Sequence, residues 1–227
     1  MKELFEKTWV RHLLVVLAIL IIWQVGAFAL RYMARTNGEQ ILAPVAKNST
    51  VEIQGMKTLS TLEKSNLQRL LNLYARVEAE KEQHKKAFLI FYPYHFTSSA
   101  FLLILSSLSV VLLFLAAQIG LNNTSPYVRT ILFTLAALTS FYALSPLVFQ
   151  QETNISTNLS KYILYDNLEG EIYNYAVTSP NVTSSNDTLS FNKFHSLITK
   201  TMSDINSINV EFDYKVIPVP DYGLTKK

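Results

Sequence analysis

Residues 85–120 read KKAFLIFYPYHFTSSAFLLILSSLSVVLLFLAAQIG, and this stretch decides the fold. Two lysines lead into an apolar run that holds no charged residue from Ala100 to Gly120. About 21 helical residues at 1.5 Å each reach roughly 30 Å, the thickness of the hydrocarbon core of a bilayer. The stretch therefore predicts a helix that enters and crosses a membrane, not a buried strand.

The residues just before Ala100 suit the boundary between membrane and water. Aromatic side chains favour the headgroup region, and lysines favour the water beside it. The expected interface residues are Lys85, Lys86, Tyr92, Tyr94 and His95. Histidine titrates near neutral pH and can act as a sensor, but an interfacial aromatic cluster already accounts for His95. Pro93 lacks a backbone donor, which predicts a kink near residues 89–91.

Two further segments have the length and composition of membrane spans. Residues 13–30, LLVVLAILIIWQVGAFAL, contain Gln24 as their only strongly polar side chain. Ala27 and Ala29 also fit the end of a cleavable signal peptide, but we expect a retained membrane anchor. Residues 131–149, ILFTLAALTSFYALSPLVF, follow the second span after LNNTSPYVRT, which predicts a tight hairpin with Asn122, Asn123 and Pro126 in its turn.

These segments predict an all-α integral membrane protein with three transmembrane helices, one anchor plus a helical hairpin. We expect an N-terminal anchor at 1–31, an irregular linker at 32–56, an amphipathic helix with an interfacial segment at 57–99, the hairpin at 100–150 and an extramembrane helical tail at 151–227. Two spans separate the long loop from the tail, so both belong to an amphipathic helical domain on one side of the membrane. The lysines and arginines near the spans divide almost evenly, which leaves the sidedness and the membrane open.

The expected domain is built from amphipathic helices. In the loop, apolar residues at helical spacing form a face for a partner helix: Leu59, Leu62, Leu70, Leu73 and Val77. In the tail, residues 155–175 and 191–208 repeat apolar side chains at the same spacing. Residues 181–188 are expected to form a loop, and residues 218–227 an extended end.

Composition excludes several functions. Charged residues make up 16% of the chain, against roughly 25% in soluble domains. The net charge of +3 comes without a basic stripe, so we expect no nucleic-acid partner. The chain has no cysteine, which excludes disulfides and thiolate sites. Seven N-x-S/T triplets begin at Asn48, Asn122, Asn123, Asn154, Asn158, Asn181 and Asn186. A few are expected by chance, and not all can be glycosylated, because Asn123 is expected on the opposite side of the membrane from Asn48.

No arrangement of residues points to catalysis. Glu80 and His84 stand four residues apart on one predicted helix, a spacing that metal sites use, but no third ligand accompanies them and a solvated salt-bridging face is the better interpretation. Asp166, Glu169 and Glu171 fan around a predicted helix and do not converge. Phosphate-binding loops and HExxH strings are absent. We expect no enzyme, no catalytic residue, no cofactor and no metal.

The hairpin carries small polar residues that leave two functions open. They are Ser106, Ser107 and Ser109 on its first helix and Thr134, Thr139 and Ser140 on its second. Such residues chiefly form helix-packing surfaces, but they could also line a pore between subunits. We therefore expect an oligomeric membrane protein that is a pore-forming or membrane-effector subunit built from the hairpin at 100–150. The alternative is a non-catalytic accessory or scaffold subunit of a larger membrane complex. Its partners would be lipid and further copies or other membrane subunits.

The order of elements resembles that of the SLATT family of two-span membrane effectors. The local likeness lies after the hairpin, in KYILYDNLEGEIYNYA, where the family has acids, a leucine and aromatic residues on one helix: Asp166, Leu168, Glu171, Tyr173 and Tyr175. The likeness covers residues 57–215 and implies a cytosolic helical domain with hairpins that assemble in the membrane. The additional span at 13–30 departs from this layout. The layout alone is also similar to that of ExbB-type stator subunits, although their glycine-rich run is missing here.

Overall fold

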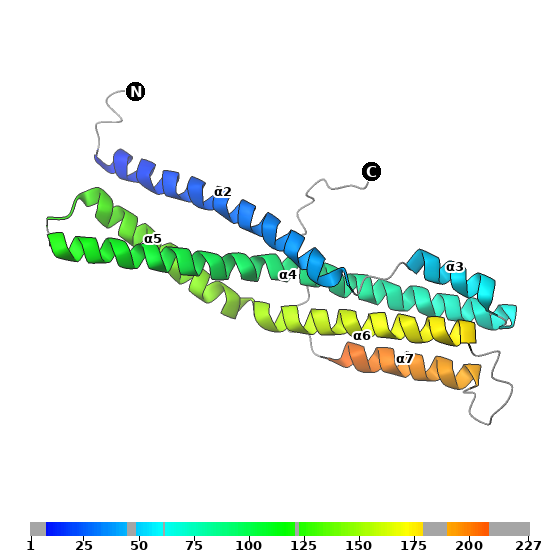
Figure 1. The fold of residues 1–227 in the computed structure, drawn as a ribbon. Coiled ribbons are helices and arrows are strands. Elements are labelled where there is room, and N and C mark those ends of the chain that lie inside the picture. The colour runs from blue at the N-terminus through cyan, green and yellow to red at the C-terminus, as the bar shows by residue number, and fades with distance from the viewer. Residues whose placement is uncertain (1–7, 45–48, 61, 121–122, 179–189, 209–227) are drawn as a thin grey trace. The chain divides into compact units, whose positions relative to one another are not determined.

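The computed structural model describes residues 8–44, 49–60, 62–120, 123–178 and 190–208 (Figure 1). These residues form α-helices and contain no strand, which confirms the predicted all-α class. The helices are α2 (Thr8–Leu42), α3 (Ser49–Leu59), α4 (Lys64–Ile119), α5 (Pro126–Val148), α6 (Gln151–Thr178) and α7 (Phe191–Ser207). Asn122, the expected loop at 181–188 and the expected extended end at 218–227 lie outside the described residues.

The chain divides into two compact units. Unit 1 comprises residues 1–40 and 89–152, and unit 2 comprises residues 41–88 and 153–227. Three helices, α2, α4 and α5, are long and apolar enough to cross a membrane. No Lys, Arg, Asp or Glu follows Lys86 in α4, and the residues from Ala100 to Ile119 alone are long enough for the span.

Unit 1 packs α2 against α4 and α5. Its buried cluster consists of Ala27, Phe101, Leu105, Leu135 and Tyr142. The Phe101 and Tyr142 rings stack with centroids 5.1 Å apart. A side chain at Gly26 would place its Cβ 3.2 Å from Cζ of Phe101. The glycine therefore allows α2 to approach α4 closely.

The end of α4 and the start of α5 both carry residues typical of helix caps. Gly120 has a φ of +87°, a left-handed conformation that glycine adopts without strain. The Ser125 side chain accepts a hydrogen bond from the Tyr127 backbone N–H, and Pro126 occupies the first turn of α5. The Arg129 side chain donates to the Thr124 carbonyl at 3.1 Å. These contacts confirm a short connection between the two helices.

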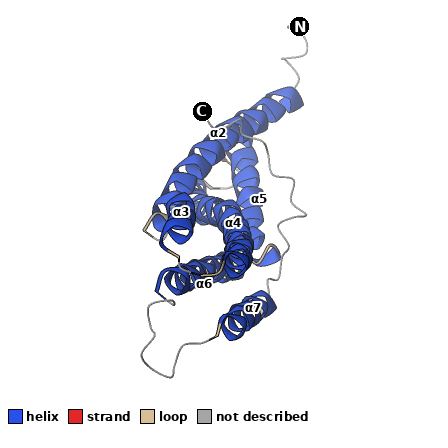
Figure 2. Cartoon of the chain, turned by 90° about the vertical axis from the view of Figure 1, so that its right-hand side faces the viewer, coloured by secondary structure: helices blue, strands red, loops and turns tan. Residues whose placement is uncertain are grey.

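Unit 2 is a helical bundle made of α3, the first part of α4, α6 and α7 (Figure 2). Lys81 on α4 contacts Glu169 on α6, and His84, which lies later on α4, contacts Asn158, which lies earlier on α6. The two helices are therefore antiparallel. The buried apolar side chains of the bundle are Met56, Leu70, Leu73, Tyr74, Val77, Tyr165, Leu168, Ile172, Ala176, Phe194, Ile198, Met202 and Ile205.

The structure corrects the expected irregular linker at 32–56. There, α2 continues to Leu42 and α3 begins at Ser49. The long amphipathic helix starts at Lys64 and not at residue 57, because the backbone leaves the helix between α3 and α4. Leu59 consequently ends α3 and is 56% exposed, whereas Leu70 and Val77 are buried in unit 2.

From Lys64 onward, the expectation of one helix that runs into the second span is confirmed. That helix is continuous through Pro93. Leu62 lies just before α4 and is partly buried against the core, and Leu73 is buried in it.

Candidate functional site

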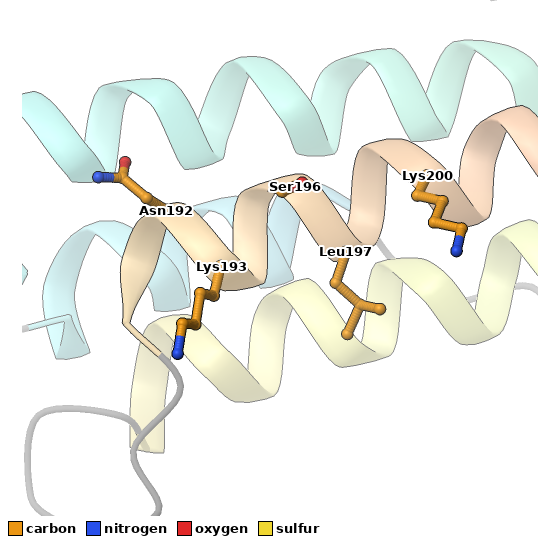
Figure 3. A pocket seen from close by; sticks show the side chains of 5 residues that line it. All are labelled: Asn192, Lys193, Ser196, Leu197 and Lys200. Atoms are coloured by element: carbon orange, nitrogen blue, oxygen red, sulfur yellow. The ribbon is translucent and has the colours of Figure 1, made fainter.

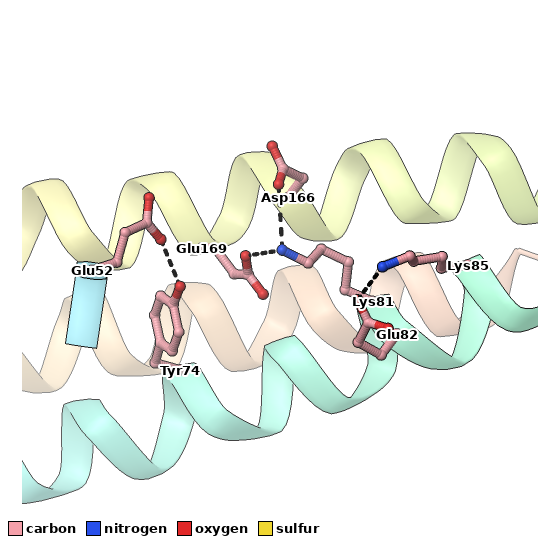
Figure 4. A network of polar contacts seen from close by, with 7 residues as sticks. All are labelled: Glu52, Tyr74, Lys81, Glu82, Lys85, Asp166 and Glu169. Carbon is pink, nitrogen blue, oxygen red and sulfur yellow. Dashed lines mark hydrogen bonds and ion pairs between the residues drawn. The ribbon is translucent and has the colours of Figure 1, made fainter. Parts of the chain in front are cut away.

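A buried group of charges lies between α4 and α6 in unit 2 (Figure 4). The Lys81 ammonium donates to Glu169 Oε2, and its Nζ lies 3.4 Å from Asp166 Oδ1. Lys81 is 4% exposed and Glu169 is 0% exposed. One cation therefore faces two carboxylates in a place that water does not reach. We call these three residues the charge cluster.

The electrostatics of the charge cluster raise the pKa values of both Lys81 and Glu169. Burial lowers the pKa of Lys81, but hydrogen bonds and charges from Glu169 and Asp166 outweigh it, so the pKa of Lys81 is raised. Burial raises the pKa of Glu169 to about 7 even though the Lys81 ammonium opposes the change, and the charges of Asp166 and Glu78 add to the increase. Oε1 of Glu169 is buried without a hydrogen-bond partner among the described residues. Lys81 thus remains an ammonium, while Glu169 binds a proton near neutral pH.

A second polar contact follows the charge cluster along the same two helices. The His84 Nδ1 and the Asn158 Oδ1 are 2.8 Å apart, and the Asn158 amide donates to the Asn154 carbonyl at 2.7 Å. The His84 ring stacks on Tyr165 with centroids 5.7 Å apart. Because an amide oxygen only accepts, the His84 Nδ1 carries the proton in this pair.

These contacts overturn the expectation of a solvated face at Glu80 and His84. His84 is buried, and Glu80 is half-buried. Two asparagines of the N-x-S/T triplets, Asn154 and Asn158, are also buried. A glycan on either asparagine would require unit 2 to open.

A third contact ties α3 to the bundle. The Tyr74 hydroxyl donates to Glu52 Oε2 at 2.5 Å (Figure 4). Burial and the hydrogen bond to Glu52 both raise the pKa of Tyr74, so its phenol stays protonated. Lys85 pairs with Glu82 at 3.0 Å three residues earlier on the same helix, at a partly exposed position. This last pair serves as a useful comparison for the buried one.

The expected interface residues differ in their burial. Lys86 is exposed, and Tyr92 is half-buried. The Arg31 guanidinium lies over the Tyr94 ring at 4.6 Å within unit 1. His95 is half-buried, with a buried Nδ1 that makes no hydrogen bond within the described part of the chain. Their position at a membrane surface stays a prediction.

The hydroxyls of the hairpin mostly bond to their own helices. Each of four donates to a backbone carbonyl three or four residues earlier: Ser106 at 3.1 Å, Thr134 at 2.9 Å, Thr139 at 2.8 Å and Ser140 at 3.0 Å. Ser107 is exposed, and the Ser109 hydroxyl is buried without a partner among the described residues. Such back-bonded hydroxyls need no further polar partner in a bilayer.

Two side-chain contacts join α2 to α5 inside unit 1. The Trp23 indole N–H donates to the Tyr142 hydroxyl at 2.6 Å. The Thr130 hydroxyl and the His12 Nδ1 are 2.9 Å apart, and the His12 ring lies 5.0 Å from that of Tyr127. Sequence reasoning did not find these pairs, because aromatic residues in a span ordinarily indicate packing alone.

Tyr142→Phe is expected to weaken the packing of α2 against α5. The change leaves the Trp23 indole N–H without its acceptor, and such hydrogen bonds in membranes are worth on average about 0.6 kcal/mol and at most about 1.7 kcal/mol. Thermal unfolding of the purified protein in nanodiscs would measure the loss. Tyr32→Phe, at an exposed position of α2, is the control. Equal stability of the two variants would contradict a stabilising role for this hydrogen bond.

Neither the surface hollow on α7 nor any group of metal-binding side chains among the described residues involves the charge cluster. This shallow hollow is lined by Asn192, Lys193, Ser196, Leu197 and Lys200 (Figure 3). Its lining shares no residue with the contacts drawn in Figure 4. Within the described ranges, no group of three or more His, Asp or Glu side chains could hold a metal ion.

Comparison with known protein families, curated proteins and solved structures finds no match for this chain. The likeness to the SLATT family and to ExbB-type subunits therefore rests on the layout and on residues such as Asp166 and Leu168. In the structure, Asp166 belongs to the charge cluster and Leu168 to the core of unit 2. Glu171 is exposed, and Tyr173 and Tyr175 are half-buried.

Sequence reasoning missed Lys81 altogether. The apolar seam of α4 passes through Leu70, Leu73 and Val77, and the next seam position four residues on is Lys81, with His84 three residues later. A charge at a seam position looks like the end of the buried face. The signal that could have found it is the pair of acids at 166 and 169 on another amphipathic helix, because these can neutralise a buried lysine.

Proposed function

We propose that this protein is a multi-pass integral membrane protein that assembles with its own copies and serves as a non-catalytic scaffold subunit. The observation that carries the proposal is that buried polar side chains hold pairs of helices together. Lys81, Asp166 and Glu169 hold α4 to α6, and Trp23 with Tyr142 holds α2 to α5. Polar contacts of this kind fix which helices pair and in what register.

The exposed faces of the spans support assembly in the bilayer. Within the most apolar stretch of each candidate span, only 6–17% of the residues are buried in the chain itself. Each span therefore leaves most of its surface for lipid or for other helices. The back-bonded hydroxyls of the hairpin favour packing over a water-filled path, since their hydrogen-bonding needs are met within each helix.

The mass of the full-length protein in nanodiscs tests the proposal. We expect a discrete oligomer whose size does not change with the ratio of protein to lipid. A monomer at every ratio would overturn the scaffold proposal.

Ser106→Leu combined with Thr139→Leu separates a scaffold from a pore. Because both hydroxyls bond only to their own helices, we expect the variant to keep the oligomeric mass of the unchanged protein. We also expect ion flux through reconstituted vesicles to stay at the level of empty vesicles for both proteins. Flux that the unchanged protein supports and the variant loses would show a pore built from the hairpin.

A further inference from the structure

One side of α2 carries a seam of side chains that the described residues leave exposed. Leu14, Leu17, Ile21, Gln24 and Phe28 follow one another at intervals of three, four, three and four residues. This is the spacing at which two helices wind around each other. All five side chains are exposed, with Ile21 at 64% and Phe28 at 66%. We call these five residues the α2 seam.

The packed side of α2 is a different one. Trp23, Gly26 and Ala27 face α4 and α5, as their contacts with Tyr142 and Phe101 show. Successive helical residues are about 100° apart, so the seam lies to one side of this packed face. Unit 1 therefore forms its own core without covering the seam.

Gln24 is the informative member of the seam. It lies near the middle of the apolar run at 13–30, and its amide makes no hydrogen bond within the described residues. An exposed amide in hydrocarbon is unfavourable, and membrane helices relieve it by hydrogen bonding to another helix. Lipid tails offer no such partner.

A second copy of the same helix meets this requirement directly. Copies inserted with the same topology bring identical residues to the same depth, so Gln24 would meet Gln24. An amide carries both donors and an acceptor, and two of them satisfy each other. A single polar residue in an apolar seam also fixes the register of two paired helices.

The charges beyond Phe28 do not oppose such a pair. Arg31 lies over the Tyr94 ring at 4.6 Å, and Arg35 pairs with Glu39 at 3.4 Å. Each guanidinium is thus engaged within its own chain. The apolar seam ends before these charges begin.

We propose that the α2 seam is a self-association surface on which a second copy of this chain docks in parallel, with Gln24 hydrogen bonded to the partner copy's identical amide. This surface specifies the contact through which the proposed oligomer forms. It rests on the proposed function, but it can fail while oligomerisation by another surface stands.

Cysteine cross-linking tests the placement, because the natural chain has no cysteine. Ile21→Cys and Phe28→Cys lie on the seam, and Ile22→Cys and Ala29→Cys lie one residue further on, at exposed positions turned away from it. Since a disulfide needs closely opposed Cβ atoms, we expect the seam variants to form dimers roughly tenfold faster in vesicles under mild oxidation. Equal rates for the two pairs would overturn the proposal, and a monomeric unchanged protein would overturn the proposed function as well.

Gln24→Leu tests the amide itself. We expect self-association, measured by energy transfer between labelled copies in vesicles, to weaken roughly three- to twentyfold, the range that one membrane hydrogen bond spans. Gln118→Leu removes another exposed amide near the end of α4 and should leave association unchanged. If the Gln24→Leu variant associated as strongly as the unchanged protein, or if both variants weakened association equally, the role of Gln24 would be overturned.

Discussion

Lys81→Met is expected to destabilise unit 2 by about 3–5 kcal/mol at pH 8, the cost of removing one partner from a buried ion pair. The substitution leaves Asp166 and Glu169 buried together without a cation. Amide hydrogen exchange along α6 would measure the free energy of opening, because this readout is local to the bundle.

Lys85→Met is the matched control. Lys85 forms a partly exposed pair with Glu82 on the same helix, and the loss of such a pair costs less than about 1 kcal/mol. A Lys81→Met variant no less stable than Lys85→Met would contradict the charge cluster as drawn in Figure 4. A triple variant, Lys81→Met with Asp166→Leu and Glu169→Met, should recover most of the loss, because no buried charge remains.

The second large effect is a pH dependence that originates at Glu169. Burial raises the pKa of Glu169 from its ordinary value of 4.5 to about 7 in the folded protein. Between these values the folded state holds a proton that the unfolded state has released, so this contribution to stability falls as the pH rises. It is fully present below pH 4.5 and lost as the pH rises through 7. A difference of two to three pKa units between the folded and unfolded states corresponds to roughly 3 kcal/mol of folding stability.

Glu169→Gln isolates this effect. Relative to the Gln variant, the unchanged protein should lose stability between pH 5 and pH 8, as measured by hydrogen exchange of α6 with correction for the intrinsic exchange rate. Glu171→Gln changes an exposed acid on the same helix and should keep the pH dependence of the unchanged protein. A relative stability that does not change over this interval would contradict the raised pKa, because a Glu169 that is ionised and held by Lys81 has already lost its proton in both states by pH 5.

The three spans could be predicted from sequence because the bilayer imposes a length and a composition that few other structures need. The segment 32–56 could not, since Asn37, Gly38 and Pro44 are local signals of a break, whereas the helix of α2 continues beyond the span to Leu42. Local preference is a weak guide there, because helical propensities differ by less than about 1 kcal/mol for most residues.

The charge cluster was beyond sequence reasoning for a different reason. Asp166 and Glu169 lie on the buried side of α6 next to Leu168 and Tyr165, so their helix looks less amphipathic than it is. Only the position of Lys81 on another helix makes their burial favourable. The same dependence on a distant partner hid the contact between His84 and Asn158.

The separation of Lys81 from its partners along the chain sets the order of events during biosynthesis. Lys81 and Asp166 are 85 residues apart, and both helices of the hairpin lie between them. The ribosome must therefore complete both helices of the hairpin before the carboxylates of Asp166 and Glu169 exist. Unit 2 can consequently close around Lys81 only after the hairpin has been synthesised, and a chain that stalls before residue 166 would leave Lys81 without its partners.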